Sequence, residues 1–298
     1  MKYYIGVDIG GTKILSILMN ADNEVVGNHQ VATDTRSAEH LFDSVVISIE
    51  TLLKVHNINH TDINAIGMGL PGLVDPEKGV AVYQSNIPWP NFPVSQRISE
   101  HFGNVPVTID NDVAVAAFNE WHGVDASTTF VYVTISTGIA ITTIIDGEIF
   151  RGNGFAGELG QTLFKYNGEY KRLEKIVSGP ALEAWYQEAT GNTNLTTKDL
   201  FRDYKENNHA KEIVNAAAEL MAVALYQVNS LIDPDTIVFG GSVITHNPEY
   251  LEAIKENLAE MLLPDQAHIL ERMFISQSQN QQGARGAVLR AMRNESDR

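Results

Sequence analysis

The feature that most constrains this chain is a run of three polar residues between a strand-like and a helix-like segment. A β-branched segment ends at Ile109, and an Ala/Val-rich segment with helical propensity starts at Val113. Asp110, Asn111 and Asp112 are therefore expected in a tight turn at the carboxyl end of a strand. Ligands bind at this edge of open α/β sheets, although Asp and Asn are also ordinary turn and N-cap residues.

Two further turns place small residues between strand-like segments. Asp8-Ile-Gly-Gly-Thr-Lys13 combines two glycines, a carboxylate, a hydroxyl and an ammonium group, and Ser136-Thr-Gly138 combines two hydroxyls with a glycine. Glycines let backbone N–H groups approach an anion, so each turn is either a phosphate-binding loop or a plain hairpin turn. Their recurrence favours phosphate binding. Two such loops on facing lobes could hold a polyphosphate from both sides.

Hydrophobic periodicity predicts alternating strands and helices. A helix capped by Ser37 is expected, with apolar residues at helical spacing up to residue 56. Other predicted strands and helices are 3–7, 14–19, 24–32, 63–70, 129–135, 139–145 and 237–239 (strands) and 178–190, 209–232 and 248–263 (helices). A proline-rich irregular loop is expected between Tyr83 and Val94. This alternation predicts the α/β class.

The composition narrows the class of protein. A chain of 298 residues can bury a large core and is expected to divide into two lobes. Its net charge of −16 argues against binding to nucleic acid or to anionic membranes, which both require a positive field. The most apolar stretch, residues 130–145, is interrupted by hydroxyl residues and is not a membrane span. Without a signal peptide pattern at its start, the chain is expected in the cytoplasm.

The short motifs form a set that is specific in combination. The set is Asp8-Ile-Gly-Gly-Thr-Lys13, Gly69-Leu-Pro-Gly72, Asn111-Asp112, Thr137-Gly138-Ile139, Gly157-Glu-Leu-Gly160, Leu173-Glu174, Ser178-Gly179-Pro180, Asp233-Pro234 and Gly240-Gly241. With this set the chain resembles, over nearly its full length, the ROK family of sugar kinases, which includes glucokinases and N-acetylmannosamine kinases. The resemblance implies a two-lobed α/β fold of the actin/hexokinase-like (ribonuclease H-like) ATPases, with a cleft between the lobes. The expected lobes are residues 1–118 with the C-terminal helix 281–298, and residues 119–280.

The resemblance also implies a role for each motif. Asp112 would be the general base, and Asp8 would help to hold Mg²⁺. ATP would be bound by Gly10, Gly11, Thr12, Lys13, Thr137, Gly138, Gly240 and Gly241. The sugar would be bound by Gly72, Asn86, Asn111, Asp112, Glu158, Gln161 and Glu174. Together these roles imply ATP-dependent phosphorylation of a hexose 6-hydroxyl by a cytoplasmic homodimer.

One departure from the family pattern concerns zinc. Family members carry a His after the Gly-Glu-x-Gly run, and this His binds a structural zinc together with three cysteines. Here Gln161 takes the His position, residues 164–172 replace the cysteine segment, and the chain has no cysteine. No structural zinc is therefore expected, and Tyr166 and Tyr170 are the expected anchors of the replacing segment. Because the family His also contacts the sugar, N-acetylmannosamine and β-glucosides such as cellobiose remain alternatives to glucose.

Two functions of another class compete with the kinase. Some family members are transcriptional repressors with a helix-turn-helix ahead of the kinase fold, but the first expected strand begins at Tyr3 and the chain is acidic. A non-catalytic sugar-sensing protein is the other alternative. Retention of Asp8, Asp112 and both phosphate turns favours the enzyme.

Purified protein should contain no stoichiometric zinc, because the usual thiolate and imidazole ligands are missing. Elemental analysis measures the metal directly. A chelator should leave the melting temperature unchanged when ATP is absent. One zinc ion per chain would contradict the prediction.

Overall fold

The computed structural model describes residues 2–84, 86–124, 128–278 and 281–296. The chain forms two compact units, one of residues 1–125 and 278–298 and the other of residues 126–277. The boundary expected after residue 118 lies within helix α3 (Asp112–His122), which belongs entirely to the first unit. Among the helices in the described ranges, none is long and apolar enough to cross a membrane.

The first unit is built on a five-stranded mixed sheet with the order β3-β2-β1-β4-β7. Its strands are β1 (Tyr3–Ile9), β2 (Lys13–Asn20), β3 (Val25–Ala32), β4 (Ile63–Leu70) and β7 (Val107–Asn111). The first three strands run antiparallel to one another, whereas β1, β4 and β7 are parallel. The carboxyl ends of these three parallel strands therefore meet at one edge of the sheet.

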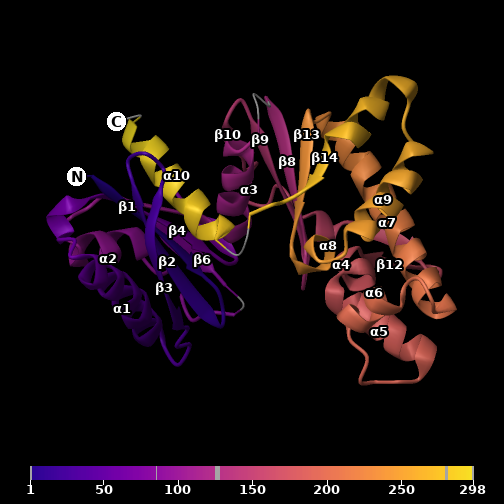
Figure 1. The fold of residues 1–298 in the computed structure, drawn as a ribbon, viewed down its shortest axis with the longest axis horizontal. Coiled ribbons are helices and arrows are strands. Elements are labelled where there is room, and N and C mark those ends of the chain that lie inside the picture. The colour runs from indigo at the N-terminus through magenta and orange to yellow at the C-terminus, as the bar shows by residue number, and fades with distance from the viewer. Residues whose placement is uncertain (1, 85, 125–127, 279–280, 297–298) are drawn as a thin grey trace. The chain divides into compact units, whose positions relative to one another are not determined.

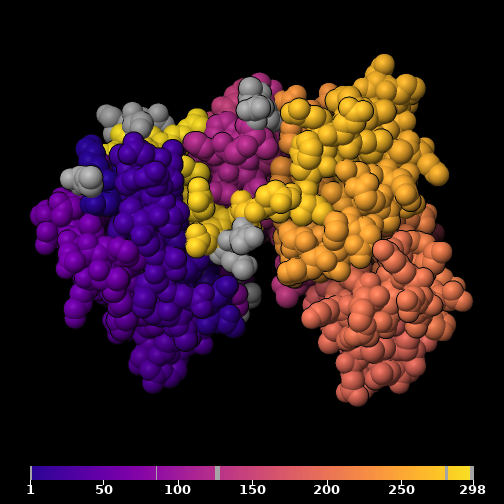
Figure 2. Space-filling view, in the orientation of Figure 1, coloured from indigo at the N-terminus to yellow at the C-terminus, as the bar shows by residue number. Residues whose placement is uncertain are grey.

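Helices cover both faces of this sheet (Figure 1). Ile5 and Val7 of β1 belong to a core with α1 (Ala38–His56), whereas Tyr4 belongs to a smaller core with α10 (Gln282–Ser296). This separation follows from the alternation of side chains along a strand. Figure 2 shows the yellow surface of α10 next to the indigo surface of the N-terminal strands.

The boundaries of α1 follow from its sequence. The Ser37 hydroxyl accepts a hydrogen bond from the His40 N–H, so the predicted N-cap is confirmed. The helix ends at Asn57, which adopts the left-handed conformation with φ 55°. The irregular loop predicted after Tyr83 is also confirmed, and the buried Trp89 anchors it by donating from Nε1 to the Ala38 carbonyl.

The second unit repeats the topology of the first, with a sheet of the order β10-β9-β8-β13-β14. Its strands are β8 (Thr129–Ile135), β9 (Ile139–Ile145), β10 (Glu148–Phe150), β13 (Thr236–Gly240) and β14 (Met273–Ile275). Again three strands are antiparallel, and β8, β13 and β14 are parallel. The turn between β1 and β2 therefore corresponds to the turn between β8 and β9, as the recurrence of small residues suggested.

Helices of the second unit share one hydrophobic core with the strands of this sheet. They are α4 (Glu174–Val177), α5 (Gly179–Thr190), α6 (Thr197–Asp203), α7 (Asn208–Ile232), α8 (Ser242–Thr245) and α9 (Pro248–Ala259). Helix α7 contributes fully buried Ala217, Ala218 and Ala224 to the core. Asp233 ends this helix in the left-handed conformation, and Pro234 prevents its continuation.

Several short elements were not predicted. They are the hairpin of β5 (Leu73–Asp75) and β6 (Val80–Tyr83), helix α2 (Val94–His101), helix α6, strand β14, and the hairpin of β11 (Leu163–Tyr166) and β12 (Glu169–Arg172). The helix predicted to reach residue 263 ends at Ala259, and a 3-10 helix over Pro264–Arg272 follows. These elements are three to nine residues long, too short for hydrophobic periodicity to separate from loops.

Glycines let α10 approach the sheet of the first unit unusually closely. A Cβ added to Gly67 of β4 would lie 1.8 Å from the Ala287 carbonyl oxygen, and one added to Gly6 of β1 would lie 2.0 Å from the Ala284 carbonyl oxygen. Figure 1 shows α10 in yellow along β1 and β4. Small residues of α10, such as Gly283, Ala284 and Ala287, suit this close packing of the helix.

Gly67→Ala should therefore destabilise the protein. The added methyl would meet backbone atoms that cannot turn aside, and overpacking of this kind costs ~3 kcal/mol. Gly123→Ala is the matched control, because its Cβ would lie 3.5 Å from the Glu120 carbonyl oxygen, an ordinary contact. Its free energy of unfolding should change by no more than ~0.5 kcal/mol. Equal denaturant midpoints for the two variants would refute the close packing.

Candidate functional site

Three residues at the edge of the first sheet share one row. Asp8 of β1 pairs in register with Gly69 of β4, and Gly69 pairs with Asp110 of β7. The side chains of residues paired in this way lie on the same face of a parallel sheet. Two carboxylates therefore flank a glycine at the carboxyl ends of three parallel strands, where α/β proteins bind ligands.

Asp112 joins this row from the first residue of α3. A Cβ added to Gly69 would lie 3.7 Å from the Asp112 Cα and 3.8 Å from Asp8 Oδ1, so both residues border the space above this glycine. Burial raises the pKa of Asp112 to about 6, and the negative charge of Asp8 contributes to the rise. A carboxylate with this pKa is well suited to accept a proton near neutral pH.

Asp8 is held in a confined position. Burial raises its pKa, and the charge of Lys13 partly opposes this effect. A Cβ added to Gly283, in the first turn of α10, would lie 2.7 to 2.9 Å from the carboxyl atoms of Asp8. The glycine therefore leaves just enough room for the carboxylate at the end of this helix.

The turn after β1 is closed by a hydrogen bond from the Gly10 N–H to the Lys13 carbonyl (2.9 Å). Thr33 fixes it from the side by donating to the Gly10 carbonyl (2.7 Å). A Cβ added to Gly11 would lie 3.3 Å from Asn86 Nδ2, so the structure brings a predicted sugar-binding residue beside a predicted phosphate turn. Thr12, which follows Gly11 in this turn, is exposed.

Gly72 and Asn111 contact each other. Asn111 Nδ2 donates to the Gly72 carbonyl (2.8 Å), while Asn111 Oδ1 caps α3 by accepting from the Val113 N–H (2.9 Å). Both ends of this carboxamide are therefore engaged, and its hydrogen bond to the Asp112 carboxylate partly opposes the rise in the pKa of Asp112. Gly72 has φ +80°, and a Cβ there would lie 2.4 Å from the Tyr83 carbonyl oxygen, so only glycine fits.

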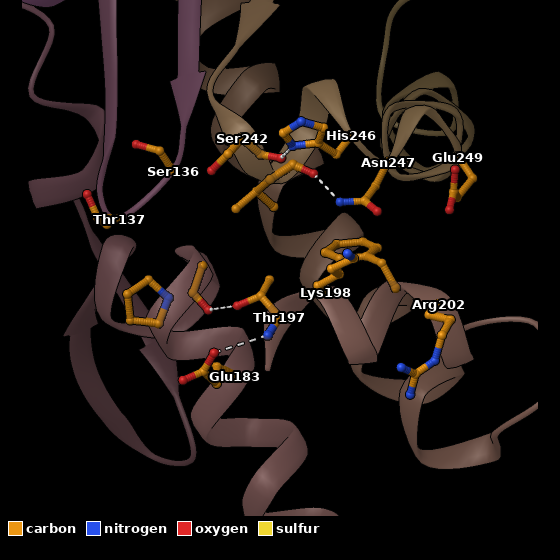
Figure 3. A pocket seen from close by; sticks show the side chains of 14 residues that line it. Ser136, Thr137, Glu183, Thr197, Lys198, Arg202, Ser242, His246, Asn247 and Glu249 are labelled. Atoms are coloured by element: carbon orange, nitrogen blue, oxygen red, sulfur yellow. Dashed lines mark hydrogen bonds between the residues drawn. The ribbon is translucent and has the colours of Figure 1, made fainter. Parts of the chain in front are cut away.

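In the second unit, Thr137 lines a cavity of about 710 Å³. The turn that carries Thr137 is closed by a hydrogen bond from the Ser136 N–H to the Gly138 carbonyl (2.9 Å). Ser136 lines the cavity beside Thr137, and the remaining polar side chains come from α5, α6, α8 and α9 and the turn before α9 (Figure 3): Glu183, Thr197, Lys198, Arg202, Ser242, His246, Asn247 and Glu249. A cavity of this size, with polar and apolar groups in its lining, can hold a drug-sized ligand.

Gly240 and Gly241 are not among the residues that line this cavity. A Cβ added to Gly240 would lie 1.9 Å from the Tyr132 hydroxyl oxygen, and Gly241 has φ +87° against the backbone of Ile135. Both glycines therefore have a packing role, which lets Ser242 start α8 at the cavity. A direct contact of these two glycines with ATP stays a prediction.

Two predicted sugar-binding carboxylates of the second unit lie close together. A Cβ added to Gly160 would lie 3.2 Å from Glu174 Oε2, and one added to Gly138 would lie 3.4 Å from the same atom. Burial raises the pKa of Glu158, and the charge of Glu174 raises it further. Gln161 follows in the 3-10 helix Leu159–Gln161 and donates its N–H to the Glu158 carbonyl.

The segment in place of the zinc ligands forms the hairpin β11–β12. Tyr166 packs against Trp185 of α5 with ring centroids 5.3 Å apart, so it is one anchor, as predicted. Tyr170 is 74% exposed, so the prediction of a second anchor there is wrong. Phe164, which is buried, takes that role. On a short hairpin, alternation puts Tyr166 and Phe164 on one side, and the sequence alone did not reveal which side faced the core.

Most lining residues of the cavity were missed in the sequence, although α6 left a signal. Thr196 caps this helix and Asp199 reciprocates, a capping box that the spacing of the two residues could have revealed. Glu183 accepts from the Thr197 N–H, and the Thr197 hydroxyl donates to the Gly179 carbonyl, so α6 is tied to α5 (Figure 3). Nothing in the sequence placed α6 beside Thr137.

Comparisons with known proteins give the chain its relatives. A glucokinase of Halalkalibacterium halodurans is 26% identical over 288 residues, which cover 88% of this chain and 87% of that protein. An N-acetylmannosamine kinase of Vibrio cholerae is 27% identical, with 80% and 83% covered. A putative xylose repressor of a Caldicellulosiruptor species is 25% identical, with 89% and 72% covered.

Solved structures agree with this picture. A ROK hexokinase from Thermus thermophilus superimposes with a TM-score of 0.85 at 28% identity, covering 99% of this chain and all of that one. A ROK glucokinase from Streptomyces griseus, solved with glucose and AMPPNP, gives a TM-score of 0.78 at 23% identity, with 98% and 99% covered. The predicted α/β fold of the actin-like sugar kinases is confirmed. The model of the "ROK family" matches residues 4–293, and the chain belongs to this family.

Proposed function

We propose that this chain is an ATP-dependent kinase that phosphorylates the 6-hydroxyl of a glucose-type pyranose. The observation that carries the proposal is Asp112, a half-buried carboxylate with a pKa of about 6 at the carboxyl edge of the first sheet. The chain belongs to the ROK family and has relatives that are named as sugar kinases, which supports phosphoryl transfer as the reaction class. In this proposal the sugar hydroxyl gives its proton to Asp112, its oxygen bonds to the γ-phosphorus, and ADP leaves.

Asp112 is proposed as the general base. Its backbone neighbour Val113 donates to Asp112 Oδ1 (2.9 Å), which fixes the carboxylate at the start of α3. Asn111 caps the same helix turn, so the base is held by an element rather than by a loop. Positioning and a single proton acceptor suffice, because phosphoryl transfer requires little covalent assistance from the protein.

Asp8 is proposed to hold Mg²⁺. No group of three or more metal-binding side chains occurs in the part of the chain that the structure describes. Mg²⁺ fits nonetheless, since it is usually bound by one or two carboxylates together with substrate phosphates. Burial raises the pKa of Asp8 and of Asp112, and the positive charge of Lys13 opposes the rise only in part and only at Asp8, so further positive charge would stabilise both carboxylates. The ion would supply this charge and neutralise the phosphates.

The cavity beside Thr137 is proposed to hold the nucleoside part of ATP. Its volume of about 710 Å³ and its lining of both polar and apolar groups suit a nucleotide. The glucokinase from Streptomyces griseus, which shares the fold, was solved with AMPPNP. On this proposal the backbone of Gly10, Gly11 and Gly138 and the side chains of Thr12, Lys13 and Thr137 bind phosphate oxygens.

The sugar is proposed to be recognised through hydroxyl groups. On this proposal Glu158 and Glu174 supply acceptors in the second unit, and Asn111 supplies a carboxamide in the first. Sites that bind hydroxyls in this way strongly reject analogues lacking them. Gln161, Asn86 and the backbone of Gly72 complete the proposed set. N-acetylmannosamine and β-glucosides remain alternative acceptors, since an N-acetylmannosamine kinase is among the relatives.

A sugar-responsive regulator is the second candidate function. It is favoured by the relative described as a putative xylose repressor, which matches over 89% of this chain. Such a protein would bind a sugar without consuming ATP. Turnover therefore separates the two candidates more sharply than sugar binding does.

ATP consumption should be measured against glucose, mannose, N-acetylmannosamine, fructose and cellobiose. We expect sugar-dependent turnover with the highest kcat/KM for glucose. Asp112→Asn should lower kcat by ~10²–10⁴, because the amide cannot take a proton, while sugar affinity stays within a few-fold. Asp22→Asn, at an exposed site, is the matched control and should retain full turnover.

Three results would revise this function. No turnover with any sugar despite saturable sugar binding would favour the regulator. Asp112→Asn activity above about a tenth of wild type would show that another group is the base. A kcat/KM for glucose more than tenfold below that for another sugar, about 1.4 kcal/mol in transition-state binding, would change the proposed substrate but not the proposed kinase activity.

Asp112→Asn should also stabilise the protein at neutral pH. The pKa of Asp112 is about 6 in the folded chain and 3.8 as its ordinary value. Between these values the folded state binds more protons than the unfolded state, so stability falls as pH rises through this window. The variant has no carboxylate to ionise here, so above pH 7 its free energy of unfolding should exceed that of the wild type by up to about 3 kcal/mol.

Denaturant unfolding at several pH values tests this gain. The advantage of Asp112→Asn over wild type should be small at pH 4.5 and complete at pH 7.5, while Asp22→Asn should show no such trend. The same carboxylate should appear as an acid limb near pH 6 in the kcat/KM profile of the wild type. A constant difference across the pH range would contradict the assignment.

A further inference from the structure

A second cavity of the second unit lies away from the residues discussed so far. It is a groove of about 410 Å³ between the turn of the β11–β12 hairpin and helices α5 and α7. Figure 1 shows β12, α5 and α7 in this unit. Its lining consists of Tyr166, Asn167, Trp185, Glu188, Ala189, Glu212, Ile213 and Ala216. None of these residues belongs to the proposed kinase machinery.

The floor of the groove is aromatic and aliphatic. Tyr166 and Trp185 lie with ring centroids 5.3 Å apart at an interplanar angle of 45°, and Ile213 adds an aliphatic wall. Both rings are only partly buried, so their surfaces are accessible within the groove. Two rings at an angle form a partial cage of the kind that binds cations through their π faces.

Two carboxylates supply negative charge at the groove. Glu188 comes from α5 and Glu212 from α7, and both are exposed. Neither forms an ion pair with any residue in the described ranges. Burial raises the pKa of Tyr166, and the charge of Glu188 adds to the rise, so this carboxylate acts on the aromatic floor.

One cation of the chain already interacts with this floor. Lys171 of β12 lies with Nζ 5.6 Å from the centroid of the Tyr166 ring. Lys171 is not among the lining residues, however, and the groove itself contains no Lys, Arg or His. The lining therefore combines two carboxylates and two aromatic rings with no cationic side chain of its own.

We propose that this groove binds a small organic cation with a planar head and an alkyl tail, of the alkylguanidinium class. The planar guanidinium would stack on Trp185 or Tyr166, as guanidinium groups commonly do. Its N–H groups would donate to Glu188 and Glu212, and the tail would lie along Ile213 and Ala216. The net charge of −16 favours the approach of such a ligand further.

The β11–β12 hairpin connects the groove to two of the proposed sugar-binding residues. Its first strand starts two residues after Gln161, and its second strand ends two residues before Glu174. The Leu173 N–H donates to the Thr162 carbonyl (2.9 Å), which closes the base of the hairpin. An occupant bound between the hairpin turn and α5 would therefore restrain the segment that carries both residues. This link rests on the proposed function, whereas the binding itself does not.

The test uses n-butylguanidinium as the probe and n-butylurea as its neutral isostere. Binding is followed by NMR at the indole N–H of Trp185, one of three tryptophans, assigned with Trp185→Phe. We expect a saturable shift with n-butylguanidinium and none with n-butylurea. The double variant Glu188→Gln/Glu212→Gln should weaken binding at least about tenfold, since both charged acceptors are lost.

Glu256→Gln/Glu260→Gln is the matched control, because it removes two exposed carboxylates at the end of α9. It should bind the probe like the wild type. The proposal is overturned by the absence of a saturable shift, by equal binding of n-butylurea, or by unchanged affinity in the groove variant. Because no nucleotide or sugar is present, the result is independent of whether the chain proves to be a kinase.

Discussion

The contact between α10 and the glycines of β1 and β4 is the constraint on which the first unit depends. Gly6 and Gly67 bring the helix backbone against the sheet, at distances that exclude any side chain. The same packing places Gly283 against the Asp8 carboxylate and Gly286 against α3. The helix therefore fixes both elements that carry the proposed metal ligand and base. The site is built on rigid packing rather than on loops, as precise chemistry requires.

The proposed site concentrates negative charge at a cost in stability. Asp8, Asp110 and Asp112 lie at one edge of the sheet, and only Asp110 has a guanidinium close by, with Arg290 Nε 3.8 Å from its Oδ2. Burial raises the pKa values of Asp8 and Asp112, and the charge of Lys13 opposes only the rise at Asp8, in part. Active sites commonly reduce the stability of a protein in this way, because the environment that raises the pKa of a carboxylate also makes it a stronger base. Arg290 belongs to α10, so the helix that packs against the glycines of β1 and β4 also supplies the positive charge near Asp110.

The sequence predicted the long elements and the motifs but not their assembly. Strong periodicity gave β4, β8, β9 and α7 to within a residue or two, and the glycine and aspartate motifs gave the family. Short elements such as α6 and β14 were missed, because a helix of about two turns or a strand of three residues shows no clear period. The pKa of Asp112 could not be predicted either, since it depends on burial and on Asp8, which lies far away in sequence. Trp185 likewise gave no sequence signal as the partner of Tyr166.

The first unit is discontinuous, since residues 126–277 intervene between its sheet and α10. During synthesis the ribosome therefore releases all five strands of this sheet long before the helix that covers its glycine face. The nascent first unit must wait with that face open, whereas the second unit is complete in one stretch and can fold as it emerges. Premature termination in the last twenty residues would leave a folded second unit attached to an unfinished partner, a natural substrate for chaperones and proteases.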